Sequence, residues 1–100
     1  MDNKQIARVG DTTHGTCYRH TKPITVDGTI TTGANGFTGD GKALARVGDT
    51  VTASCGHTGI INSGASKATC NGRPIARVGD TFTGDYVGNI TSGYGKGTVI

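Results

Sequence analysis

The sequence has no tryptophan and no glutamate, and it holds only one methionine and two phenylalanines among its 100 residues. All seven acidic residues are aspartates. No window of about eleven residues sustains an apolar stripe at helical spacing, which excludes a helix bundle. A chain of this length forms one domain that buries only about two-thirds of the surface of its unfolded chain, so its core needs additional support.

Long apolar runs and clusters of basic residues are missing as well. The polar residues 1–5 contain no apolar leader segment, and no stretch approaches the roughly 20 apolar residues of a membrane helix. We therefore expect a protein that is made and folded in the cytoplasm without a signal peptide, and that leaves it through a machine for folded proteins or through lysis. The ten lysines and arginines are scattered, so no nucleic-acid partner is expected.

The abundant residues point to short strands. Glycine supplies 18 and threonine 17 of the 100 residues. Threonine suits a pleated surface, and glycine supplies the positive φ of tight turns. The three cysteines are an odd number, and a reducing compartment disfavours disulfides, so we expect thiols that bind metal or pack in the core. The predicted fold class is all-β.

A heptad of the form Ile/Leu-Ala-Arg-Val-Gly-Asp-Thr occurs three times. Its copies are residues 6–12, 44–50 and 75–81. Each copy is followed by a Gly-x-Ile-x-x-Gly segment, and these segments are residues 28–33, 59–64 and 88–93. Asp-Gly at 40–41 and Asn-Gly at 71–72 are typical of two-residue hairpin turns. The chain is thus predicted to be one domain, 1–100, with β-hairpin repeats at about 5–42, 43–73 and 74–100.

Such repeats must pack on one another, because one unit cannot bury its apolar side alone. Three similar units pack most simply around a pseudo-threefold axis. The first repeat opens directly with its heptad, and the third stops at 98–100 without a returning turn. We therefore expect the two ends of the chain to complete one another.

The repeats differ in the excursion between the heptad and the next Gly-x-Ile segment. From the heptad aspartate to the first glycine the separation is 17, 10 and 8 residues, so the third repeat is the bare scaffold. The two longer excursions hold every histidine and two of the three cysteines, which are His14, Cys17, His20, Cys55 and His57. Two neighbouring loops could supply two ligands each to a tetrahedral zinc ion, and a site closed only in the folded state would support the small core.

Cys70 differs from these residues because it stands beside a predicted hairpin turn, inside the scaffold. We interpret it as a small core residue. The Arg-Val-Gly-Asp segments are interpreted structurally, with glycine for a turn and aspartate for hydrogen bonds to nearby backbone amides.

The segment Pro74-Ile75-Ala76-Arg77 is similar to the Pro-Ala-Ala-Arg signature of the PAAR family. The Gly-x-Ile-x-x-Gly segments, His14-Gly15 and Cys55-Gly-His57 also resemble that family. The resemblance implies a small cone with zinc near its point, seated by its base on a trimeric β-helical spike of a type VI secretion system (VgrG-type) or a contractile phage tail. It also implies three histidines and one cysteine as ligands of one structural zinc ion. Because they are concentrated in the two longer excursions, we predict His14, His20, Cys55 and His57 as the zinc ligands, with Cys17 in reserve.

The predicted function is a spike tip, not an enzyme: one chain caps one trimer and touches the target membrane transiently. A small zinc hydrolase would need an open coordination position and usually a carboxylate base, yet glutamate is absent and Asp27 stands only at the end of an excursion. A zinc-binding nucleic-acid module would need a recognition helix or an aromatic stacking surface, and the sequence suggests neither.

Overall fold

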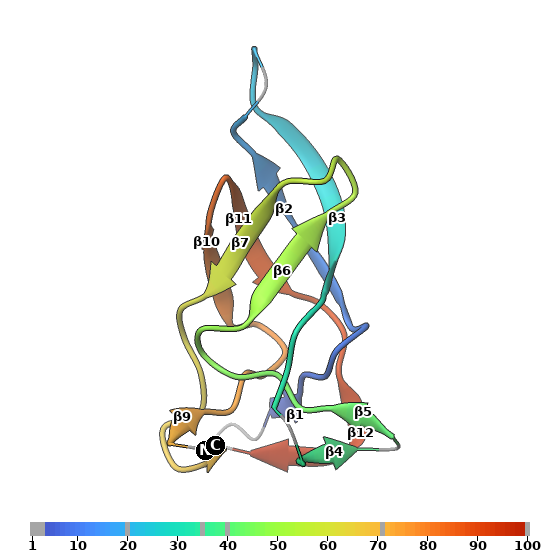
Figure 1. The fold of residues 1–100 in the computed structure, drawn as a ribbon, viewed down its shortest axis with the longest axis vertical. Helices are drawn as coiled ribbons and strands as arrows, with labels where there is room; N and C mark the ends of the chain where they lie inside the picture. Colours follow the sequence, from blue (N-terminus) through green and yellow to red (C-terminus); the bar gives the residue numbers. More distant parts are fainter. Residues whose placement is uncertain (1–3, 20, 35, 40, 71, 100) are drawn as a thin grey trace.

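The computed structural model describes residues 4–19, 21–34, 36–39, 41–70 and 72–99, the last five of them by their backbone. These residues form short strands and no helix, so the predicted all-β class is confirmed. The strands are β1 Lys4–Ile6, β2 Thr12–Cys17, β3 Ile24–Ile30, β4 Thr38–Gly39, β5 Lys42–Ala43, β6 Thr50–Ala53, β7 Thr58–Ile61, β8 Thr69–Cys70, β9 Arg73–Pro74, β10 Thr81–Gly84, β11 Tyr86–Ile90 and β12 Tyr94–Val99. The molecule is a cone of 39 × 28 × 23 Å, with a broad base and a narrow apex (Figure 1). The described part of the chain offers no helix with the length and apolar character that a membrane span requires.

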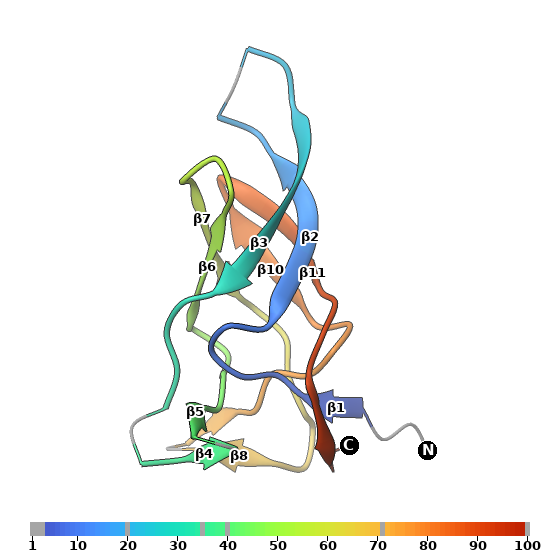
Figure 2. The ribbon, with the colours of Figure 1, turned by 90° about the vertical axis from the view of Figure 1, so that its right-hand side faces the viewer.

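The upper part of the cone is a closed antiparallel barrel with the strand order β10-β11-β2-β3-β6-β7. Each repeat contributes one hairpin, and the first hairpin, β2–β3, rises highest (Figure 2). The closed ring leaves no edge strand to pair with another chain. Side chains alternate along the strands, and the barrel core contains Ile30, Val51, Ile61, Phe82, Tyr86 and Ile90.

Below the barrel, the heptad alanines of the three repeats meet in a ring of backbone hydrogen bonds. Ala7 N–H donates to the carbonyl of Ala76, Ala76 N–H to that of Ala45, and Ala45 N–H to that of Ala7, each at 2.9 Å. All three alanines are fully buried. A cyclic set of equivalent bonds is what a threefold axis produces, so the predicted pseudo-threefold arrangement is present in the scaffold.

Each Arg-Val-Gly-Asp segment forms the same turn. In the third copy, Asp80 N–H donates to the Arg77 carbonyl at 3.0 Å, and Arg77 N–H donates to the Asp80 carboxylate at 2.7 Å. The intervening Gly79 has φ +93°, in the left-handed region that favours glycine. The structural interpretation of this motif is therefore correct.

The heptad aspartates also link consecutive repeats. The hydroxyl of Ser63 donates to Asp80 at 3.0 Å and accepts the Thr81 N–H at 3.0 Å. The equivalent pairs are Thr32 with Asp49, and Ser92 with Asp11, each at 3.1 Å. Because the third repeat contacts the first, the hydroxyl–aspartate links run once around the axis.

The base consists of three equivalent two-stranded units. Two are the hairpins β4–β5 and β8–β9, whose turns contain Gly41 at φ +80° and Gly72 at φ +79°. The third is formed by β1 and β12, where Lys4 stands opposite Val99 as Lys42 stands opposite Gly39. The expected pairing of the first and last strands is confirmed, and Figure 1 shows β1 and β12 at the base. Cys70 is buried there with Ala34 and Ile75, as expected for a core residue.

The barrel is narrow enough that some strand positions admit only glycine. A Cβ at Gly59 would overlap the carbonyl oxygen of Tyr86 and lie 3.1 Å from the Phe82 ring. We expect Gly59→Ala to lower the free energy of unfolding by about 2–3 kcal/mol in urea titrations. Gly36→Asn is the control, because Gly36 has φ +84° with open space around it and asparagine tolerates that conformation, so a loss of about 1 kcal/mol or less is expected. Equal losses in the two variants would contradict the close approach.

The Asp80 carboxylate gives the fold a pH dependence. Burial alone would raise the pKa of Asp80, but hydrogen bonds from Arg77 and Ser63 outweigh it and lower that pKa below its usual value. A carboxylate with a lowered folded pKa stabilises the protein above the unfolded pKa, and this stabilisation is lost as the pH falls through the folded pKa. The thermal midpoint should therefore fall as the pH drops below about 4.

Asp80→Asn should destabilise the protein at neutral pH by about 2 kcal/mol and flatten the acid limb of the midpoint curve. The matched control is Asp85→Asn, because Asp85 is about half exposed and lies 3.8 Å from the exposed Arg19. That variant should change the neutral stability by less than about 1 kcal/mol. An acid limb that is equally steep in Asp80→Asn would assign the pH dependence to other groups.

Candidate metal centre

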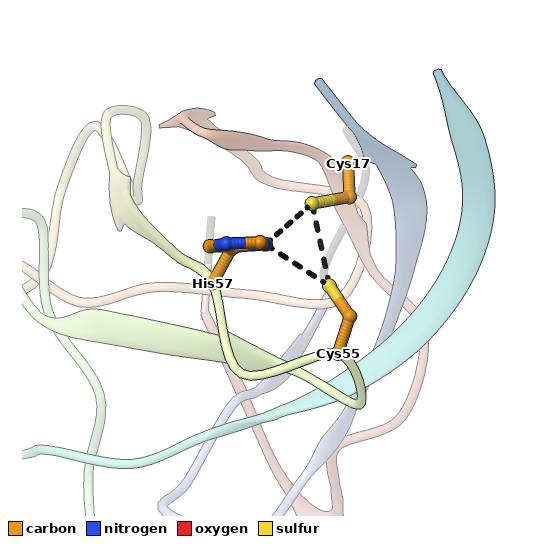
Figure 3. A group of neighbouring side chains, drawn as sticks. All are labelled: Cys17, Cys55 and His57. Carbon is orange, nitrogen blue, oxygen red and sulfur yellow. Dashed lines mark hydrogen bonds between the residues drawn. The ribbon is translucent and has the colours of Figure 1, made fainter. Parts of the chain in front are cut away.

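Three side chains with metal-binding atoms converge inside the upper barrel. Cys17 is the last residue of β2, and Cys55 and His57 lie in the turn between β6 and β7. The Cys17 Sγ lies 3.3 Å from the Cys55 Sγ and 3.1 Å from the His57 Nδ1, and the Cys55 Sγ lies 3.5 Å from that nitrogen. Figure 3 shows the two sulfurs and the imidazole pointing toward one another. The first and second repeats therefore meet at this group, which we call the apical Cys/His group.

The position of Cys17 follows from the alternation of β2. Thr13 and Cys17 are buried, whereas His14 between them is exposed. Successive side chains of a strand point to opposite faces, so residues 13, 15 and 17 share the inner face. Thr13 can be buried because its hydroxyl forms a hydrogen bond with the Tyr86 hydroxyl at 2.9 Å.

Cys55 and His57 are brought to the same place by a tight turn. The Ala53 N–H donates to the His57 carbonyl at 2.8 Å, and the Gly56 N–H donates to the Ala53 carbonyl at 2.9 Å. Gly56 has φ +92°, so a residue with a Cβ would be strained between the two side chains. The turn is fixed to the first repeat by the Ser54 N–H, which donates to the Asp27 carbonyl at 2.8 Å.

The spacing of the three donor atoms fits zinc. Zinc–sulfur bonds of about 2.3 Å and zinc–nitrogen bonds of about 2.0 Å place tetrahedral donor atoms about 3.5–3.8 Å apart. The donor atoms of the apical Cys/His group all lie within 4.8 Å of one another, and two thiols with one imidazole are a usual zinc donor set. These residues could therefore hold a metal ion with small side-chain adjustments.

The Cys17 thiol of the apical group has a pKa above its ordinary value. Burial is the main cause that raises the pKa of Cys17, and the neighbouring Cys55 raises it further. Zinc binds the thiolate, so metal binding would release protons and become tighter as the pH rises.

The structure brings together only part of the predicted ligand set. Cys55 and His57 lie together with Cys17, the reserve ligand. His14 lies on the outer face of β2, where its Nδ1 is 2.6 Å from the Asp27 Oδ1, and both side chains are exposed. His20 lies outside the described residues. The assignment of the ligands remains a prediction, and the arrangement favours Cys17 over His14.

The spacing of His14 and Cys17 along the sequence already indicates that only one of them can lie inside the barrel. His14 and Cys17 are an odd number of positions apart, so they must face opposite sides of one strand. A strand assignment for residues 12–17 would have placed only one of them inside the barrel. The buried side could then be assigned only by knowing that Thr13 faces Tyr86.

Comparison with known proteins agrees with this architecture. A family model described as the PAAR motif matches residues 20–85, which is more than half of the chain. No curated protein matches the chain. The matched region contains the second and third heptads together with Cys55 and His57. With three heptads around one axis and a match of this extent, the chain belongs to the PAAR-motif family.

Proposed function

We propose that this protein is a spike tip that caps and sharpens a trimeric β-helical spike of a contractile phage tail or a type VI secretion system. The observation that carries the proposal is the family match over residues 20–85, because the PAAR family is a structural spike-tip family. In this proposal the chain is made in the cytoplasm, assembles at the tip of the spike and is delivered outside the cell. Its contact with the target membrane is transient.

The symmetry of the cone supports one tip on one trimer. Two corresponding cross-strand pairs recur in the three units of the base, so each unit can present a similar surface to one protomer of a threefold partner. The excursions that break the symmetry lie at the opposite, narrow end (Figure 1). A single chain can thus present a threefold base and an asymmetric apex.

We further propose that one zinc ion is bound by Cys17, Cys55 and His57, with His20 as the fourth ligand. His20 follows Cys17 by three residues, and a Cys-x-x-His spacing is compatible with two ligands to one ion. Bound zinc would supply coordinate bonds that hold the first hairpin of the barrel to the turn of the second. Such a staple would stiffen an apex that has too few residues for an apolar core of its own.

The donor set favours a structural ion over a catalytic one. Within the described residues, the apical Cys/His group contains no carboxylate that could serve as the base of a zinc hydrolase. Asp27, whose carboxylate binds His14, lies with it on the outer face of the barrel.

Substitution of the metal ligands tests the zinc proposal. We expect one zinc per chain by elemental analysis, and at least about a 100-fold loss of zinc affinity in Cys17→Ser and in His57→Ala. The thermal midpoint should fall on the order of 10 °C in both variants and after chelation of wild type. His14→Ala is the matched control and should keep its zinc, because His14 points away from the group. Stoichiometric zinc in Cys17→Ser, or its loss in His14→Ala, would refute this ligand set.

Native mass measurement of the protein with its cognate spike tests the capping proposal. We expect one chain per trimer, held at the base. Thr38→Arg together with Thr69→Arg adds bulk and charge at the exposed first residues of β4 and β8 and should weaken binding at least about tenfold. Thr25→Arg is the control, because Thr25 is exposed on β3 in the barrel. Three chains per trimer, or equal weakening by Thr25→Arg, would argue against seating by the base.

A further inference from the structure

The apical Cys/His group contains a pair of thiols that lie close enough to react with each other. The Cys17 and Cys55 sulfurs lie 3.3 Å apart and come from different repeats, 38 positions apart in the chain (Figure 3). A disulfide bond is about 2.05 Å long, so the sulfurs need to approach by only about 1.2 Å. Cys70, the third thiol, is buried in a separate cluster at the base. Two of the three thiols are thus positioned to react with each other.

We propose that Cys17 and Cys55 form an intramolecular disulfide when the apical site holds no metal and the surroundings are oxidising. The apex would then be closed by one of two alternative staples, a metal ion or a disulfide. This inference rests on the proposed metal site in one respect only, which is that the two staples exclude each other.

The reaction consumes a low-molecular-weight disulfide such as oxidised glutathione. Cys55 is half-buried and Cys17 is fully buried, so the oxidant reaches Cys55 first. The Cys55 sulfur loses its proton to water and attacks the oxidant, whose S–S bond breaks and releases one glutathione thiol. Cys17 then loses its proton and attacks the Cys55 sulfur of the mixed disulfide, which releases the second glutathione. Two protein thiols are oxidised, and one glutathione disulfide is reduced to two thiols.

The two staples exclude each other because they use the same sulfur atoms. Zinc binds cysteine as the thiolate, and a sulfur in a disulfide has no thiolate to offer. Conversely, a thiolate bound to zinc is shielded from the oxidant. Either staple joins the end of β2 to the β6–β7 turn, so either one closes the same loop of the chain and stiffens the same contact.

The test uses the full chain, reduced and freed of metal, then treated with oxidised glutathione. Intact mass after alkylation should show a loss of two hydrogen atoms and one remaining alkylated thiol, which peptide mapping should assign to Cys70. The thermal midpoint should rise on the order of 10 °C on oxidation. Prior loading with zinc should slow the reaction at least tenfold.

Variants separate this pair from unspecific oxidation. Cys70→Ala should form the same disulfide at the same rate, whereas Cys17→Ser should stop at a mixed disulfide with glutathione on Cys55. Cys55→Ser, changed at a half-buried position, provides a second variant in case Cys17→Ser does not fold, and it should form no disulfide between Cys17 and Cys70. Three alkylated thiols in wild type, a disulfide that includes Cys70, or disulfide-linked dimers would overturn the proposal. Equal rates with and without zinc would overturn the exclusion of one staple by the other.

A separate zinc titration of the reduced chain distinguishes this inference from the proposed function. If the reduced chain binds zinc but its thiols resist oxidation even when the metal has been removed, the disulfide is refuted and the metal site stands. If the disulfide forms in a chain that binds no zinc, the metal site is refuted and the reactive thiol pair stands.

Discussion

The ring of backbone hydrogen bonds among Ala7, Ala45 and Ala76 is the constraint on which the rest of the cone depends. Each alanine donates to one repeat and accepts from the other, so no repeat can turn without breaking two bonds of the ring. Full burial at the axis explains why the position is alanine, since a larger side chain would have to displace a neighbouring repeat. The ring fixes three heptads at equivalent angles, and their turns then send one hairpin each to the barrel and one strand pair each to the base.

A polar network supplies the order that a small apolar core cannot supply. A partly buried arginine–aspartate pair adds only modest net stability, because desolvation offsets part of the attraction. Its contribution here is geometric: Asp80 closes its own turn through Arg77 and binds the preceding repeat through Ser63. These hydrogen bonds therefore fix how each repeat is aligned with the one before it.

The first copy shows how one residue disturbs this network. Tyr94 stands where the other repeats have Ala34 and Ala65, and the Arg8 guanidinium lies over its ring, 4.7 Å from the centroid. The Arg8 Nε is consequently 3.6 Å from its aspartate, whereas the corresponding distance for Arg77 is 2.9 Å. The stacking of cation on ring replaces part of the ion pair without changing the backbone turn.

The scaffold could be predicted from the sequence, and the centre of the site could not be predicted fully. The heptads and the turn glycines recur, and repetition alone implies three equivalent units and the pairing of the chain ends. The excursions do not repeat, so composition could supply only a set of candidate ligands. To choose between His14 and Cys17, one must know which alternate residues of β2 face the core. Residues 12–17 contain no large apolar side chain that would indicate this. The inward-facing side of β2 is fixed by a distant residue, Tyr86, whose hydroxyl contacts that of Thr13.

The first excursion contacts both of the other repeats near the apex. On one side, Cys17 meets Cys55 and His57 of the second repeat. On the other side, the next residue, Tyr18, donates its N–H to the Asp85 carbonyl of the third repeat at 2.8 Å. Consecutive residues of one strand end therefore contact two different repeats. These contacts connect the raised β2–β3 hairpin to the hairpins of the other two repeats.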